Sequence, residues 1–170
     1  MSLTMYRASV PVFIRGLEVL ASLLTKAEAH AKEQGVDPAT LVEARLAPDM
    51  FTLAGQVQRA SDASKLAVKR LVAGEAPAFE DTETTLPQLQ ERIAKTIAYL
   101  SSVDAAAFAG SEERAIELKA GPHAINFVGL NYLFEFALPN FYFHVTVAYS
   151  ILRNQGLKIG KLDYLGPLQH

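Results

Sequence analysis

The chain has 170 residues, of which 50% are hydrophobic and 20% are charged, and its 16 basic and 18 acidic residues leave a net charge of −2. This size and composition indicate one globular domain, residues 1–170, with a core that needs no disulfide or structural metal. The lack of a basic block argues against nucleic acid as a partner, and the absence of cysteine excludes thiolate nucleophiles and Cys-ligated zinc.

The N-terminal residues are not typical of a signal peptide, because Arg7, Arg15 and Glu18 interrupt their apolar character. No run of 18 uncharged apolar residues occurs, so we expect no transmembrane helix and no membrane partner. The default expectation is a cytoplasmic protein.

The first expected helix runs from about Ser2 to Gln34 and ends at Gly35. Pro11 lies inside this span, where proline removes a backbone hydrogen bond. Two alternatives follow, a kinked long helix or a helix that starts near Ser9, and we favour the kinked one. One stripe at helical spacing carries the apolar residues Val10, Ile14, Leu17, Ala21, Leu24 and Ala31.

The second expected helix has the clearest bundle seam. Pro48 and Asp49 are expected to open it, and Gly74 is expected to close it. The seam residues alternate three and four apart: Met50, Leu53, Val57, Ala60, Ser64, Ala67 and Leu71.

The third expected helix begins after an acidic, exposed connection, Glu75–Thr84. Thr85 and Gln88 fit a capping box, with Pro87 inside the first turn. Its buried stripe is Leu86, Leu89, Ile93, Ile97 and Leu100.

Between Glu113 and Val128 the hydrophobic period changes from helical to two. Ile116 and Leu118 alternate with charged residues, and the sequence Gly121-Pro122-His123 separates this run from a second one. The pattern predicts a short β-hairpin.

The fourth expected helix spans about Leu138–Asn154, with Pro139 in its first turn and Gly156 as its stop. It is apolar almost all round, which predicts a helix buried on most sides. We expect it to pack beside the second helix, with Val57 and Ala60 near Val145 and Ala148. The tail, Leu157–His170, is expected to be irregular.

A few polar residues interrupt these buried helices. Asn140 and His144 lie four apart and share one face, and Gln56 can face the same interior from the second helix. A core histidine held by hydrogen bonds is the favoured interpretation of His144, ahead of a metal-free polar pocket and of a metal ligand. Gln56 on its own is more typical of a packing or capping amide, and Asp62 is expected to point elsewhere.

Three stretches resemble the bacterial family known as domain of unknown function 1993. They are RLAPDMF with QVQ at residues 45–51 and 56–58, ALPNFYFHVT running to ILR and Gly156 at residues 137–156, and GKLDYLG at residues 160–166. The similarity covers nearly the whole chain. That family is similar to the DinB-like proteins, which implies a mainly all-α fold: an up-down four-helix bundle, often dimeric, here with a short hairpin between the third and fourth helices.

The resemblance also implies a site. Many DinB-like proteins bind a divalent metal through three histidines, and some use it to activate a low-molecular-weight thiol. Their last histidine corresponds to His144, whereas the other two correspond to Asn140 and Gln56. Amides are weak ligands for Zn²⁺ or Ni²⁺, so we expect no cofactor and no tightly bound metal. A metal, if one binds, would use these three residues.

Three functions compete. The first is binding of a small molecule in an interior pocket lined by Gln56, Asn140 and His144, without catalysis or with weak acid–base chemistry at His144. The alternatives are a divalent-metal-dependent transferase or hydrolase of the DinB type and a non-catalytic dimeric interaction protein. A homodimer is expected from the resemblance and from the surplus of apolar residues. Whether the protein is an enzyme stays open, since HExxH, GxxxxGK[ST], GxGxxG and GxSxG are all absent.

Overall fold

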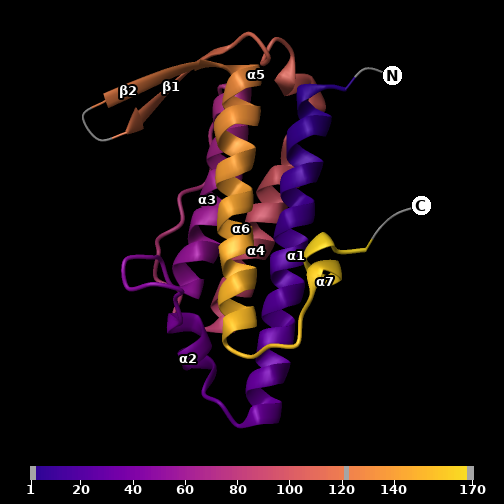
Figure 1. Ribbon diagram of the computed structural model, residues 1–170. Helices are drawn as coiled ribbons and strands as arrows, with labels where there is room; N and C mark the ends of the chain where they lie inside the picture. The colour runs from indigo at the N-terminus through magenta and orange to yellow at the C-terminus, as the bar shows by residue number, and fades with distance from the viewer. Residues whose placement is uncertain (1–2, 121–122, 168–170) are drawn as a thin grey trace.

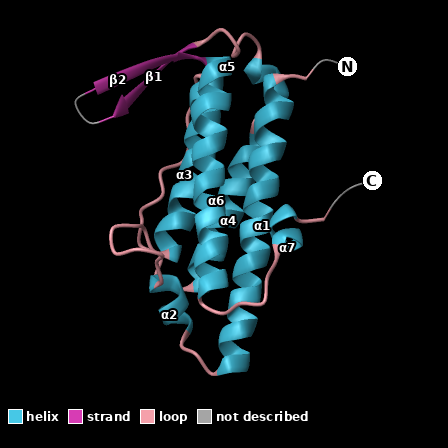
Figure 2. Cartoon of the chain, in the orientation of Figure 1, coloured by secondary structure: helices cyan, strands magenta, loops and turns pink. Residues whose placement is uncertain are grey.

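The computed structural model describes residues 3–120 and 123–167, and its four long helices stand side by side as a bundle (Figure 1). These helices are α1 (Met5–Gln34), α3 (Leu53–Val72), α4 (Leu86–Ser102) and α6 (Leu138–Asn154). A two-stranded hairpin projects from one end of the bundle (Figure 2). The expected fold class, mainly α-helical with a hairpin between the third and fourth helices, is confirmed.

Helix α1 begins where Thr4 accepts a hydrogen bond from the Arg7 N–H at 3.3 Å, and it ends at Gly35 with φ 64°. The expected start at Ser2 lies outside the described residues. The helix continues through Pro11, which confirms one long helix rather than a start near Ser9. By length and composition α1 is able to cross a membrane, but 56% of that apolar stretch is buried in the bundle, as in the core helix of a globular protein.

The start of α3 was predicted wrongly. Residues 46–50 form turns, so Asp49 lies before the helix, and Thr52 is the cap that accepts from the Gly55 N–H at 3.2 Å. Threonine suits this position because its hydroxyl replaces a missing helical acceptor. The helix ends at Val72 because Ala73, not Gly74, adopts the left-handed conformation, with φ 51°. A short helix that the sequence did not predict, α2 (Pro38–Glu43), precedes these turns.

Helix α4 begins with the capping box that the sequence predicted, Thr85 with Gln88. The contacts of α4 show that it runs parallel to α3 and not against it. Gln58, near the start of α3, bonds Glu83, which precedes α4, and Tyr99, near the end of α4, bonds the carbonyl of Glu75 just beyond α3. The topology therefore differs from strict up-down alternation, because residues 73–85 return along the bundle as a crossover.

A short 3₁₀-helix, η1 (Ala105–Phe108), leads to the hairpin, in which β1 (Ala115–Ala120) pairs antiparallel with β2 (His123–Val128). Ile116 and Leu118 are buried, as their alternation predicts. Gly121 and Pro122 of the expected turn lie outside the described residues.

The fourth bundle helix starts earlier than predicted. α5 (Gly129–Asn131) and a π-helical segment, η2 (Tyr132–Ala137), lead without a break into α6. The Leu138 N–H bonds the Leu133 carbonyl, five residues back. Such a wide turn accommodates Pro139, which has no N–H of its own to donate.

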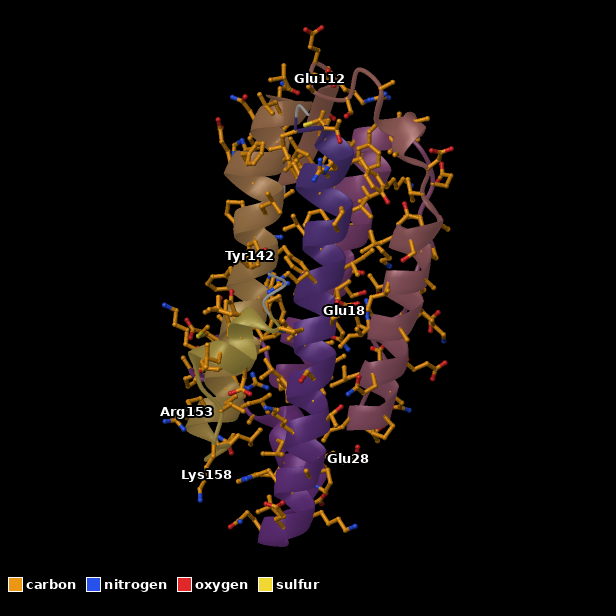
Figure 3. The ribbon with its side chains drawn as sticks, turned by 90° about the vertical axis from the view of Figure 1, so that its right-hand side faces the viewer. Glu18, Glu28, Glu112, Tyr142, Arg153 and Lys158 are labelled. Carbon is orange, nitrogen blue, oxygen red and sulfur yellow. The ribbon has the colours of Figure 1, made fainter. Side chains whose placement is uncertain are left out.

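Helices α3 and α6 form the most extensive helix–helix contact of the described residues. The predicted packing of these two helices is confirmed, and Val57, Ala60, Val145 and Ala148 are all buried. Helix α6 is not buried on most sides, however, because Phe143 is 54% exposed and Tyr142 is 37% exposed. The tail is also more regular than expected, since α7 (Lys161–Leu165) packs beside α1 (Figure 3).

Candidate functional site

A cavity of about 250 Å³ lies between α3, the hairpin and the continuous helix of η2 and α6. It brings together residues that are far apart in the sequence. Its lining comprises Arg59, Asp62, Ala63, Leu66, Arg70, Leu118, Lys119, Ile125, Tyr132, Phe136, Ala137, Asn140 and His144.

A hydrogen bond to Gln56 orients His144, one of the residues that line this cavity. His144 Nδ1 lies 2.8 Å from Gln56 Oε1, and both side chains are buried. Gln56 Nε2 donates to the Phe51 carbonyl at 3.4 Å, which turns Oε1 toward the histidine. Nδ1 must then carry the proton and donate, so Nε2 keeps its lone pair. Nε2 makes no hydrogen bond to any residue that the structure describes.

Burial, and to a smaller degree the nearby Arg59 guanidinium, lower the pKa of His144 to about 4. Both causes disfavour the charged imidazolium. At neutral pH the ring is therefore neutral, with one donor committed to Gln56 and one acceptor available.

The three residues predicted for the site occupy different places. Asn140 and His144 line the cavity together, as their spacing on one helix face indicates. Gln56 is not part of the lining. It is buried behind His144 and fixes the orientation of the ring from α3.

Several lining residues escaped the sequence analysis. Asp62 was expected to point elsewhere, but it lines the same cavity as His144. Arg59, Leu66 and Arg70 share its stripe on α3. These residues recur three or four apart, directly beside the apolar seam of that helix. Charged residues that repeat at helical spacing beside a buried seam were the signal that could have predicted this side of the cavity.

Two of the charged residues that line the cavity, Arg59 and Asp62, are held in ion pairs. The Asp62 carboxylate accepts from Arg92 at 3.1 Å and from Lys65 at 3.2 Å, and it lies 3.4 Å from Arg59. Arg59 also pairs with Asp81. Arg70 and Lys119 are different, since no carboxylate of the described residues pairs with either of them, and the Arg70 guanidinium bonds the neutral Tyr132 hydroxyl at 3.0 Å.

The donor set does not fit the divalent metal that the DinB resemblance implies. No group of three His, Cys, Asp or Glu side chains converges anywhere in the described ranges, 3–120 and 123–167. His144 is the one imidazole of the site, and its Nδ1 is engaged by an amide. The Arg59 guanidinium beside it opposes a second positive charge.

Comparisons with known proteins agree on the family. A family model described as "Domain of unknown function (DUF1993)" matches residues 5–165. A crystal structure of a DinB family member protein from Shewanella denitrificans is 39% identical and superposes with a TM-score of 0.93. The match covers 98% of this chain and 94% of that one. No curated protein matches the chain.

Proposed function

The chain belongs to the DUF1993 family of DinB-like bundles, and from the geometry of its cavity we propose that it binds a small organic molecule beside His144 without a tightly bound metal. The observation that carries this proposal is the unpartnered Nε2 of a neutral histidine in the lining of a cavity. A ligand hydroxyl or amine can donate to this acceptor, and the fixed tautomer of the ring sets the direction of that hydrogen bond.

The rest of the lining supports binding of an organic molecule. Leu66, Ile125 and Phe136 offer apolar contacts, and the Asn140 amide offers both a donor and an acceptor. Largely apolar walls with a few convergent polar groups are typical of small-molecule sites. A volume of about 250 Å³ limits the ligand to a small one.

The same geometry favours binding over acid–base catalysis. A general base works best when its pKa lies near the operating pH. The pKa of His144, at about 4, makes the ring a weak base at neutral pH. We therefore assign His144 the role of a hydrogen-bond acceptor for the ligand.

Elemental analysis tests the metal-free part of the proposal. The protein is purified without an affinity tag or added metal, and we expect far less than one equivalent of Zn, Ni or Fe per chain. One equivalent that disappears in His144→Ala would overturn this part of the proposal.

A neutral fragment tests the cavity itself. Isotope-labelled protein is titrated with 3-phenylpropanamide, and we expect the NMR signals of Asn140 and His144 to shift. Leu66→Trp fills the cavity and should abolish these shifts, whereas Leu46→Trp, at an exposed position outside the lining, should leave them unchanged. No shift at the solubility limit of the fragment would overturn the binding function.

The homodimer is a second proposal, and it rests on exposed aromatic side chains. Phe51 is 56% exposed and Phe143 is 54% exposed. Both adjoin the Gln56–His144 pair, since Gln56 bonds the Phe51 carbonyl and the Phe143 ring packs edge-on against His144 at 5.3 Å. Large exposed aromatic residues that gather at one place are typical of protein–protein contacts.

A further inference from the structure

Positive charge exceeds negative charge around the cavity. Arg59, Arg70 and Lys119 line it, against the single carboxylate of Asp62. His144 adds no charge at neutral pH, because burial keeps the pKa of its ring well below the usual value. A cavity with this balance attracts an anion.

The ion pairs show where the excess lies. Arg59 is engaged by Asp62 and Asp81, and Asp62 is in turn engaged by Arg92, whose side chain is 1% exposed. These charges neutralise one another within the protein. Arg70, and Lys119 on the hairpin, have no carboxylate partner in the described part of the chain, so the excess positive charge lies at the hairpin end of the cavity.

Tyr132 adds a second donor at the same place. Its hydroxyl accepts from Arg70 Nη1 at 3.0 Å, and the guanidinium carbon lies 5.8 Å from the centre of its ring. Burial raises the pKa of Tyr132, so the hydroxyl keeps its proton and is free to donate it. The pair thus presents guanidinium N–H groups and one O–H at a single point, which matches the two oxygens of a carboxylate.

The other residues that line the cavity indicate what the rest of such a ligand would contact. Ala63, Leu66 and Phe136 lie between the Arg70 end of the cavity and the end that holds Asn140 and His144. Among the α3 residues that line the cavity, Arg59 and Arg70 are the farthest apart, about 16 Å along the helix axis at 1.5 Å per residue. The cavity is therefore elongated, and the apolar part of a ligand held at Arg70 would extend along these walls in the direction of His144.

We propose that the ligand of this cavity is a small carboxylic acid with an extended apolar body, bound through its carboxylate to Arg70 and Tyr132. This inference rests on the proposed small-molecule function and names the chemical class of the ligand. A carboxylate suits the site, because the Arg70 guanidinium has no carboxylate partner among the described residues and apolar walls adjoin it.

The experiment compares 3-phenylpropanoate with 3-phenylpropanamide, two probes of nearly the same shape that differ in charge. NMR titrations of the isotope-labelled protein give the dissociation constant of each at the cavity. We expect the acid to bind about ten-fold more tightly than the amide, which corresponds to about 1.4 kcal/mol. Arg70→Gln should remove this preference and leave the affinity for the amide within about two-fold.

Lys69→Gln is the matched control, because it removes the same charge one residue away. Lys69 pairs with Glu75 and does not line the cavity. A preference for the acid that survives in Lys69→Gln and vanishes in Arg70→Gln supports the inference.

Two results would overturn the inference and spare the proposed function: equal affinities of the unmodified protein for the acid and the amide, or a preference for the acid that persists in Arg70→Gln. Binding of neither probe would overturn the proposed function, and the inference with it. The NMR spectrum of each variant reports directly whether it is folded.

Discussion

His144 Nδ1 lies 2.8 Å from Gln56 Oε1, so one hydrogen bond joins α6 to α3 across the main helix–helix contact of the bundle. Both side chains are buried, and each satisfies a polar atom that the other would otherwise leave unpaired. The bond also fixes the tautomer of the ring, because the Gln56 amide is oriented by the Phe51 carbonyl.

Gln56→Leu should therefore destabilise the protein. It leaves the Nδ1–H of His144 buried without an acceptor, which costs about 1–3 kcal/mol. Urea unfolding at pH 7 measures the change. Gln56→Glu is the control that keeps an acceptor, and its negative charge should raise the pKa of His144 in an NMR titration. An unchanged unfolding midpoint in Gln56→Leu would contradict the importance of this bond.

The lowered pKa of His144 makes stability depend on pH. Above pH 6.5 the ring is neutral in both the folded and the unfolded chain. As the pH falls from 6.5 to about 4, the unfolded chain takes up the proton first. Proton binding favours the unfolded chain, so the free energy of unfolding decreases. The loss from this residue is at most about 3 kcal/mol.

His144→Gln should flatten this part of the stability curve. Urea unfolding at intervals between pH 7 and pH 4 should show a steeper decline in the original protein than in the variant. The difference between the two curves isolates His144, because the other titrating groups are common to both. Parallel curves would show that the ring titrates near its ordinary pKa.

The seam of α3 gives a packing prediction. Leu53 is fully buried, so Leu53→Ala should cost about 2–5 kcal/mol of unfolding free energy. Leu46, which is 42% exposed before the helix, offers the matched control, and Leu46→Ala should change stability by no more than about 0.5 kcal/mol. A thermal melt that Leu53→Ala leaves unchanged would mean that the seam is not the core of the bundle.

Sequence periodicity predicted the four long helices because each must bury one continuous apolar stripe, and such a stripe repeats visibly along the chain. It failed at the start of α3, where Pro48 and Asp49 resemble a helix start but Thr52 provides the cap. It also missed α2 and α7, which are too short to show a period. Local patterns therefore located the helices better than their ends.

The candidate site was predictable only in part. The family resemblance predicted a site at Gln56, Asn140 and His144, and two of these residues, Asn140 and His144, line the cavity. Arg70 and Tyr132 were not predicted, because their contact depends on the π-helical turn of η2, which begins the fourth bundle helix before Leu138. Contacts of that kind arise from tertiary structure and leave no mark on local spacing.

One buried arginine, Arg92, makes several of the contacts that hold the crossover of residues 73–85. Arg92 bonds the Glu80 carbonyl and the carboxylates of Asp62, Asp81 and Glu83. Arg92→Met would leave these carboxylates without their central partner, and we expect a loss of about 3–5 kcal/mol. Limited proteolysis should then cut the crossover faster than in the original protein.

Lys95→Met provides the comparison for Arg92. Lys95 pairs with Glu91 on the exposed surface of α4 at 2.7 Å, and such pairs contribute at most about 1 kcal/mol. The two variants remove the same charge from the same helix. Equal stabilities of Arg92→Met and Lys95→Met would show that the buried cluster does not hold the crossover.

The last prediction concerns the proposed homodimer. If a second copy covers Phe51 and Phe143, which are each more than half exposed, the protein should sediment as a dimer at micromolar concentration. Phe143→Ser should shift the equilibrium toward the monomer, because it removes an apolar anchor from the contact. Leu162→Ser tests specificity, since Leu162 is 74% exposed on α7 and its loss should leave the dimer intact. A single species of monomer mass in the original protein would rule out the dimer at that concentration. A dimer that Phe143→Ser leaves unchanged would assign the interface to another face of the bundle.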